Sequence, residues 1–138
     1  MIYQSTGTLR YMIDNSGRKM FLRVAQDLVN YYRSLMPKYI QIQPQAYPAH
    51  ISAIRKEYIA PDKLHLWGKY EGEEIEFSYD NYIHNGTVYY WLNCFCTRLE
   101  KIRVEFGLPI SSQYTRPPSG FDKVFHVTIG NRKHEIGT

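Results

Sequence analysis

Two triplets in this sequence place a hydroxyl two residues after a histidine: His50-Ile51-Ser52 and His126-Val127-Thr128. Residues two apart on a strand project to the same side, so each triplet would present an imidazole beside a hydroxyl, with its apolar middle residue turned away. Two such triplets brought together would supply a base, an acid and hydroxyl donors for phosphate oxygens. The pattern predicts a metal-independent phosphodiesterase site with the catalytic residues His50, Ser52, His126 and Thr128.

Composition alone can produce two triplets of this kind, because the chain has five histidines and many hydroxyl residues. Their context favours the catalytic interpretation. Both triplets lie in apolar, strand-like runs, and they fall in separate halves of the chain. His65, His84 and His134 lack a matching hydroxyl and are interpreted as surface residues.

The N-terminal third is predicted to hold two strands and a helix. Apolar and polar residues alternate over 8–13 and 19–24, and the turn residues at 14–17 lie between these runs. Over 26–36 the apolar spacing becomes helical, and Pro37 marks the end of that helix. The competing interpretation is a single long helix over 19–36.

Strands are next expected over 50–54, 73–79 and 87–95, with Asn85-Gly86 as a type I′ hairpin turn. A second helix follows, with Thr97 and Glu100 as a capping box. Its buried face is predicted to carry Leu99, Ile102 and Phe106, and Gly107 ends it. A last strand is expected over 124–129. Residues 1–138 are therefore predicted to form one α+β domain with a mainly antiparallel sheet.

The paired His-x-Ser/Thr triplets, each with an apolar middle residue, resemble the motifs of the two-histidine (2H) phosphoesterase superfamily. The stretches 67–77, 99–109 and 125–131 are similar to those of the phage anti-CBASS phosphodiesterases in that superfamily. These viral enzymes degrade the cyclic di- and trinucleotide messengers of bacterial immunity. The resemblance covers most of the chain from about Leu28 to Asn131.

The resemblance implies a bilobal α+β fold, with two strand sets around a central cleft and two helices packed outside. It implies attack by a ribose 2′-hydroxyl on the adjacent 3′–5′ phosphodiester, with one histidine as base and the other as acid. Ser52 and Thr128 would bind the phosphate. The sequence does not assign the base and acid roles.

Other residues are candidates for substrate binding. Thirteen tyrosines and two tryptophans in a basic chain favour base stacking, and Tyr11 and Trp67 lie in or beside polar loops. Tyr114 and Arg116 fall in the loop-like segment 109–120, which forms either a lid over the substrate or a plain loop.

The charge and cysteine content limit the partners and the location. The net charge of +4 and the pI near 9.0 favour an anionic ligand such as a cyclic oligonucleotide, without the basic excess that duplex nucleic acid requires. Cys94 and Cys96 are expected to be reduced thiols, and their spacing does not suit a metal site. No signal peptide, membrane-spanning stretch or cofactor loop is recognised, so a cytoplasmic protein without cofactors is expected. The resemblance to the phage enzymes implies that it acts in the infected bacterium.

Two alternatives to the cyclic substrates stay open. The same chemistry could act on RNA ends or linear 2′–5′ oligoadenylates, or the protein could bind nucleotides without cleaving them. The segment 130–138 could reach a neighbouring subunit in a homo-oligomer.

Overall fold

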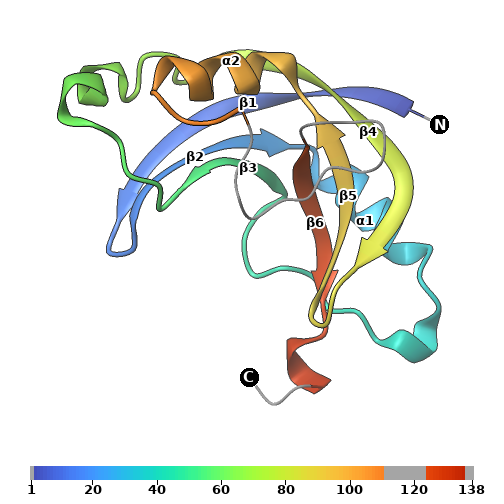
Figure 1. The fold of residues 1–138 in the computed structure, drawn as a ribbon. Coiled ribbons are helices and arrows are strands. Elements are labelled where there is room, and N and C mark those ends of the chain that lie inside the picture. The colour runs from blue at the N-terminus through green and yellow to red at the C-terminus, as the bar shows by residue number, and fades with distance from the viewer. Residues whose placement is uncertain (1, 111–123, 136–138) are drawn as a thin grey trace.

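Strand β1 (Ile2–Asp14) organises the fold because it pairs with two different strands along its length. Its second half pairs with β2 (Gly17–Val24), and its first half pairs with β4 (Glu74–Asn85). The computed structural model describes residues 2–110 and 124–135, in which six strands close into an antiparallel barrel in the order β1-β2-β3-β6-β5-β4 (Figure 1). The remaining elements are β3 (His50–Arg55), β5 (Tyr89–Phe95), β6 (Phe125–Asn131), α1 (Gln26–Ser34), α2 (Thr97–Glu105) and the short 3-10 helices η1 (Lys38–Ile40), η2 (Pro61–Leu66) and η3 (Lys133–Glu135).

The closed barrel shows that the predicted bilobal fold with a central cleft is wrong. Two lobes would need two sheets that part at a cleft. Here β3 pairs directly with β6, and β1 joins the β2 side of the sheet to the β4 side. Alternation along a strand shows which face is buried, but it does not show which strands are neighbours.

The N-terminal hairpin confirms the prediction of two strands joined by a turn at 14–17, and the alternative of one long helix over 19–36 is wrong. Asp14 pairs with Gly17, whose φ of 116° suits glycine. The Asp14 carboxylate accepts hydrogen bonds from the backbone N–H and the hydroxyl of Ser16, at 2.8 Å and 2.6 Å. Helix α1 follows within the range predicted for it.

The second half of the chain departs from two local predictions. The hairpin of β4 and β5 forms, but Asn85 pairs with Tyr90 and the Gly86 N–H donates to the carbonyl of Tyr89, so the turn lies at residues 87–88 and the predicted turn at Asn85-Gly86 is wrong. Helix α2 has Cys96 as its N-cap, without a side-chain cap hydrogen bond, so the predicted capping box at Thr97 is also wrong. Its C-terminal end is as predicted, with Gly107 at a φ of 80°.

The core consists of side chains that point into the barrel, together with the apolar face of α2. Buried and more exposed positions alternate along much of the strands, as in half-buried strands, although β5 and β6 also contain consecutive buried residues. The predicted apolar face of α2 is confirmed, because Leu99, Ile102 and Phe106 are all buried. The fully buried strand residues include Leu9, Leu22, Ile51, Leu92, Val127 and Ile129.

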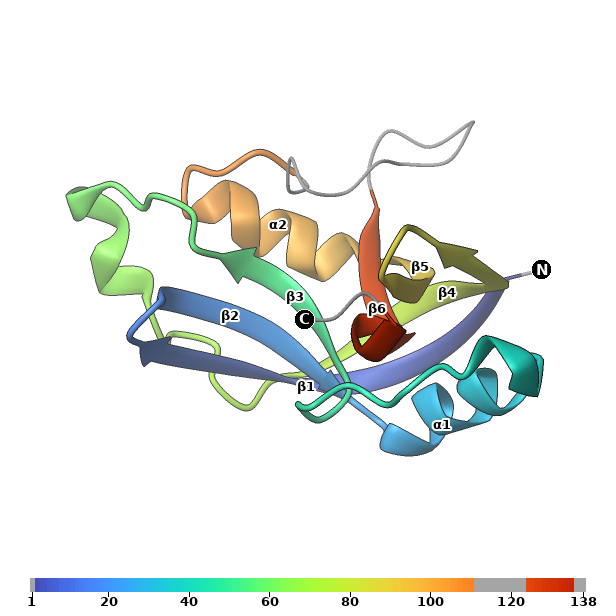
Figure 2. The ribbon, with the colours of Figure 1, turned by 90° about the horizontal axis from the view of Figure 1, so that it is seen from below.

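The two α-helices of the described residues lie on separate sides of the barrel (Figure 2). Helix α1 contacts β6, where Arg33 donates to the carbonyl of Ile129 at 3.0 Å. Helix α2 contacts β3 and β4. None of the helices described in residues 2–110 and 124–135 has the length and hydropathy needed to cross a membrane.

Gly7 lies where β1 changes partners, because it pairs with Val24 of β2 and with Ile75 of β4. A Cβ atom at this position would lie 2.6 Å from the carbonyl oxygen of Arg23 and 2.7 Å from Cγ of Leu22. The variant Gly7→Ala is therefore expected to lose about 1–3 kcal/mol of unfolding free energy. Urea unfolding measures the loss.

The matched control is Gly86→Ala, where the nearest atom to an added Cβ is 3.6 Å away, an ordinary contact. We expect this variant to change the unfolding free energy by less than about 0.5 kcal/mol. Equal losses in the two variants would contradict a steric role for Gly7.

Candidate active site

The barrel brings the two histidine triplets side by side, because β3 and β6 are neighbouring antiparallel strands (Figure 1). Ile51 pairs with Val127, and both side chains are fully buried. The outer residues of the two triplets must then project from the opposite, outer face of the barrel. The site therefore lies on the outside of the barrel instead of in a cleft between lobes.

The register fixes how the four candidate side chains are arranged. An antiparallel pair at Ile51 and Val127 sets His50 opposite Thr128 and Ser52 opposite His126. The two histidines are then diagonal neighbours, whose Cβ atoms lie about 7–8 Å apart in a regular sheet. At that separation, both imidazoles can reach one phosphate group from its two sides.

His50 is held by a backbone carbonyl at the start of β3. Its Nδ1 lies 2.8 Å from the carbonyl oxygen of Pro48. Since a carbonyl only accepts hydrogen bonds, Nδ1 carries the proton, and Nε2 is the nitrogen left for a substrate. The edge-on ring of Phe21, with its centroid 5.6 Å away, also packs against the imidazole.

The ring of His126 is partly buried. Its ring stacks on Trp91, with centroids 4.9 Å apart and planes inclined by 26°. Burial, and secondly the neighbouring His84, lower the pKa of His126 from the ordinary 6.5 to about 4. His126 is therefore a neutral imidazole at pH 7.

The lowered pKa of His126 makes the stability of the fold depend on pH. Between pH 4 and 6.5 an unfolded chain binds a proton at His126 and the native protein does not, so stability falls as the pH drops through this window. With allowance for the partly exposed ring, we expect a loss of about 2 kcal/mol between pH 7 and pH 4. Urea unfolding at the two pH values measures this loss.

Other groups also titrate in this window, so the variant His126→Gln serves as the reference. Its unfolding free energy should fall less on acidification than that of the wild type, by the contribution of His126. The same pH dependence in both proteins would show that the native His126 ring accepts a proton as readily as an unfolded one.

A small cavity of about 10 Å³ lies beside His50, close to the least space that can hold one water. His50 and Thr128 both line it, which agrees with their placement on opposing strands. Gln26 of α1 accepts a hydrogen bond from the backbone N–H of Ala49 at 3.0 Å and so ties α1 to the start of β3. The other lining residues are Val29, Gln45, Tyr47, Pro48 and Ala49. Ser52 is exposed on the same outer face.

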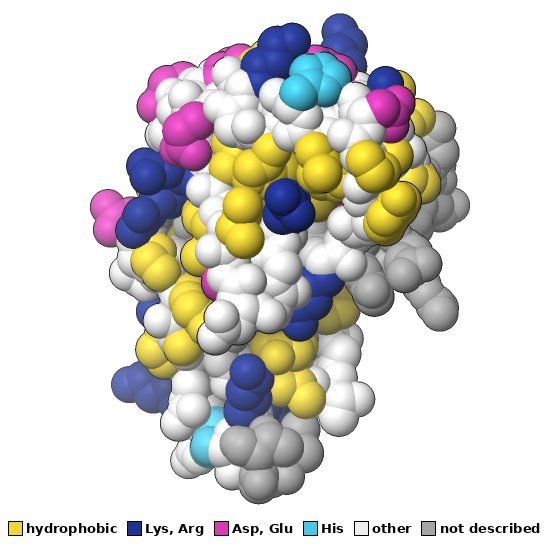
Figure 3. All heavy atoms as spheres, turned by 90° about the vertical axis from the view of Figure 1, so that its left-hand side faces the viewer, with side chains coloured by type: hydrophobic (Ala, Val, Ile, Leu, Met, Phe, Trp, Pro, Cys, Tyr) yellow, Lys and Arg dark blue, Asp and Glu magenta, His cyan; other side chains and the backbone are white. Residues whose placement is uncertain are grey.

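Tyr11 and Trp67, predicted to bind substrate, lie elsewhere. Tyr11 pairs with the fully buried Met20 and shares its face of the sheet, opposite to the face of the histidines. The rings of Tyr11 and Trp67 meet edge to face at 5.0 Å, and Trp67 also packs against Phe106 at 5.8 Å. Burial raises the pKa of Tyr11 to about 12. Figure 3 shows hydrophobic side chains gathered on the surface at the side of the molecule where the β1–β2 hairpin ends.

Tyr114 and Arg116, the other predicted substrate-binding residues, lie outside the described residues. The structure therefore brings together His50, Ser52, His126 and Thr128, but it does not bring Tyr11 or Trp67 to them.

The chain was compared with known protein families, curated proteins and solved structures. None of them matches it. The resemblance to the two-histidine phosphoesterases stays a prediction, and the chemistry of the site rests on its own side chains.

Three residues on β4 and β5 extend the candidate site, although the sequence did not indicate them. Trp91 pairs with Thr128, Asn93 pairs with His126, and His84 pairs with Trp91 across the next strand boundary. His84 is partly buried and accepts a hydrogen bond, so the interpretation of it as an isolated surface residue is wrong. The signal was the alternation of Trp91 and Asn93 on one face of a predicted strand.

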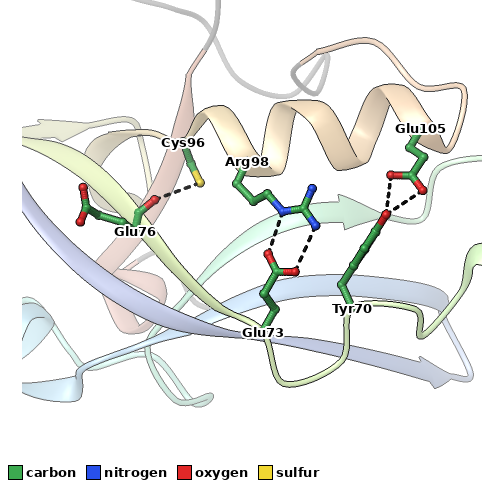
Figure 4. Close-up of polar contacts among 6 residues, drawn as sticks. All are labelled: Tyr70, Glu73, Glu76, Cys96, Arg98 and Glu105. Atoms are coloured by element: carbon green, nitrogen blue, oxygen red, sulfur yellow. Dashed lines mark hydrogen bonds and ion pairs between the residues drawn. The ribbon is translucent and has the colours of Figure 1, made fainter.

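The two cysteines do not belong to the site. Both are free and buried, and burial raises the pKa of both thiols, so neither is an activated nucleophile. The Cys96 thiol donates to the carbonyl of Glu76, beside the paired side chains of Arg98 and Glu73 (Figure 4). Within the described ranges, no group of three His, Cys, Asp or Glu side chains could hold a metal ion.

Proposed function

We propose that this protein is a metal-independent phosphodiesterase that cleaves 3′–5′ bonds of cyclic di- and trinucleotide messengers. The observation that supports it best is the antiparallel pairing of Ile51 with Val127, which puts two imidazoles and two hydroxyls on one face. Acid-base cleavage of a phosphodiester needs these groups around one phosphate.

The environments of the two histidines support different roles. His126 is neutral at pH 7 because its pKa is lowered to about 4, so its ring is in the unprotonated form that a base requires, and we assign it the proton of the ribose 2′-hydroxyl. His50 donates through Nδ1 to the Pro48 carbonyl, which leaves Nε2 as the nitrogen that faces the substrate, so we assign His50 the role of the acid that protonates the leaving oxygen.

The first step forms one bond to phosphorus and breaks another. The 2′-oxygen attacks phosphorus while its proton passes to His126, and the bond to the 5′-oxygen breaks as His50 protonates that oxygen. Ser52 and Thr128 donate hydrogen bonds to the non-bridging oxygens, where negative charge gathers. A 2′,3′-cyclic phosphate results. Water then opens it with the two histidines in reversed roles.

Such an enzyme would linearise the messengers of bacterial CBASS defence and so let a phage evade that defence. The proposed site of action is therefore the bacterial cytoplasm. The net charge of +4 supports attraction of an anionic substrate.

The direct test incubates the protein with cyclic dinucleotides and trinucleotides in excess EDTA. We expect linear products that end in a phosphate, and no cleavage of 2′-O-methyl analogues, which lack the attacking hydroxyl. Cleavage that depends on added metal, or cleavage of the 2′-O-methyl analogues, would refute this mechanism.

Linear 2′–5′ oligoadenylates and RNA ends form the second arm of the same experiment. Faster cleavage of these substrates than of the cyclic ones would keep the chemistry and replace the proposed substrate. Recovery of intact cyclic nucleotide from a stable complex would instead show a binding protein.

A further inference from the structure

The rings of His126, Trp91 and His84 form a row across the outer face of the barrel. The Trp91 centroid lies 4.9 Å from that of His126 and 6.0 Å from that of His84, with interplanar angles of 26° and 20°. Strand β5 lies between β6 and β4, so the two histidines approach the indole from its two flanking strands. The orientation of the His126 ring therefore depends on where the indole is held.

Hydrogen bonds hold that indole. The Trp91 Nε1–H group can only donate, and it donates to Oδ1 of Asn93 at 3.3 Å. This bond orients the Asn93 amide so that its Nδ2 faces Nε2 of His84, 3.1 Å away. An amide nitrogen only donates, so Nε2 of His84 is the acceptor.

The network is sheltered from water. Asn93 is only 4% exposed, so its amide has little access to solvent as an alternative partner. The Tyr82 ring packs against His84 with centroids 4.7 Å apart. Because each buried polar group would lose its partner if its neighbour were removed, the orientations of these side chains are coupled.

We propose that His84 and Asn93 are positioning residues of the candidate site, which hold Trp91 against His126 and so fix the imidazole toward the phosphodiester. The inference rests on the proposed function, in which His126 is the base. The two residues act through the indole. The lowered pKa of His126, to which His84 contributes, agrees with this coupling.

The test compares His84→Ala and Asn93→Ala with the wild type on a cyclic dinucleotide. A base displaced by about 1 Å can cost up to a hundredfold in rate, so we expect kcat to fall about 10- to 100-fold with KM changed less than about threefold. NMR titration of His126 should show its midpoint rising from about 4 toward 6.5 in Asn93→Ala, which removes a hydrogen-bonding group without removing a charge.

The variant His84→Gln restores an acceptor for the Asn93 amide and is expected to recover kcat to within about threefold of the wild type. Asn85→Ala, an exposed neighbour on the same strand, is the matched control and should leave both readouts unchanged. Unchanged kcat in both alanine variants and an unchanged titration midpoint in Asn93→Ala would overturn the positioning role.

The two readouts separate this inference from the proposed function. A wild-type protein that cleaves no phosphodiester refutes the function, and the titration of His126 in Asn93→Ala then decides whether the network holds its ring. An active wild type with unaffected variants refutes the inference and leaves the function standing.

Discussion

Replacing His50 or His126 with alanine is expected to lower kcat/KM for a cyclic dinucleotide by about 10²- to 10⁴-fold. Each substitution removes one proton-transfer group from a face where the hydroxyls and the other imidazole remain. The double variant should lose little more than either single variant, because the base and the acid act in the same step. The loss is measured by monitoring product formation by chromatography, in reactions that contain EDTA.

The control for this experiment is His65→Ala. His65 is exposed in η2, away from β3 and β6, and its loss should leave kcat/KM within about twofold of the wild type. Urea unfolding of each variant separates a loss of chemistry from a loss of fold. Full activity in a folded His126→Ala variant would refute the assignment of this face as the active site.

The face that carries His50 and His126 shows what a strand pattern can predict. The spacing of two residues in each triplet predicted that the histidine and the hydroxyl lie on one face of the strand, and the burial of Ile51 and Val127 on the other face agrees with this prediction. The pairing of β3 with β6 could not be predicted from the sequence, because it joins segments more than seventy positions apart and no local turn specifies it. For the same reason the closed barrel replaced the expected lobes.

A register error explains why His84 was missed. A two-residue turn at Asn85-Gly86 would pair Ile83 with Val88, but Ile83 instead pairs with Leu92. The turn lies two residues further along the chain, which shifts β5 along β4 and places His84 opposite Trp91. A local turn signal therefore predicted the hairpin correctly but not the residues that face each other across it.

Arg103 is the other feature that apolar periodicity could not reveal. It lies among the apolar residues of α2, and its side chain is fully buried. Its Nη1 and Nη2 donate to the two carboxylate oxygens of Glu57 at 2.7 Å and 2.8 Å. It also donates to the backbone carbonyls of Ala53 and Pro109, at 2.6 Å and 2.7 Å. A charge at this depth is tolerated because these four bonds satisfy it.

The variant Glu57→Ala is therefore expected to lose about 3–5 kcal/mol of unfolding free energy, because it leaves the Arg103 charge buried without its counter-ion. Urea unfolding measures the loss. The matched control is Arg10→Gln, which breaks the exposed pair with Glu71, at 51% and 42% side-chain exposure, and should cost less than about 1 kcal/mol. Equal losses in the two variants would contradict a special role for burial.

A double variant distinguishes two contributions to the unfolding free energy: the destabilisation by an unpaired buried charge and the stabilisation by the ion pair. Replacing both partners, as Glu57→Leu with Arg103→Met, removes the buried charge together with its counter-ion, so it should destabilise less than Glu57→Ala alone. Arg103 also binds the carbonyl of Ala53, the residue after Ser52 on β3. If this bond holds β3 in place, the double variant should recover stability yet lose part of the phosphodiesterase rate, because Ser52 is then less firmly positioned.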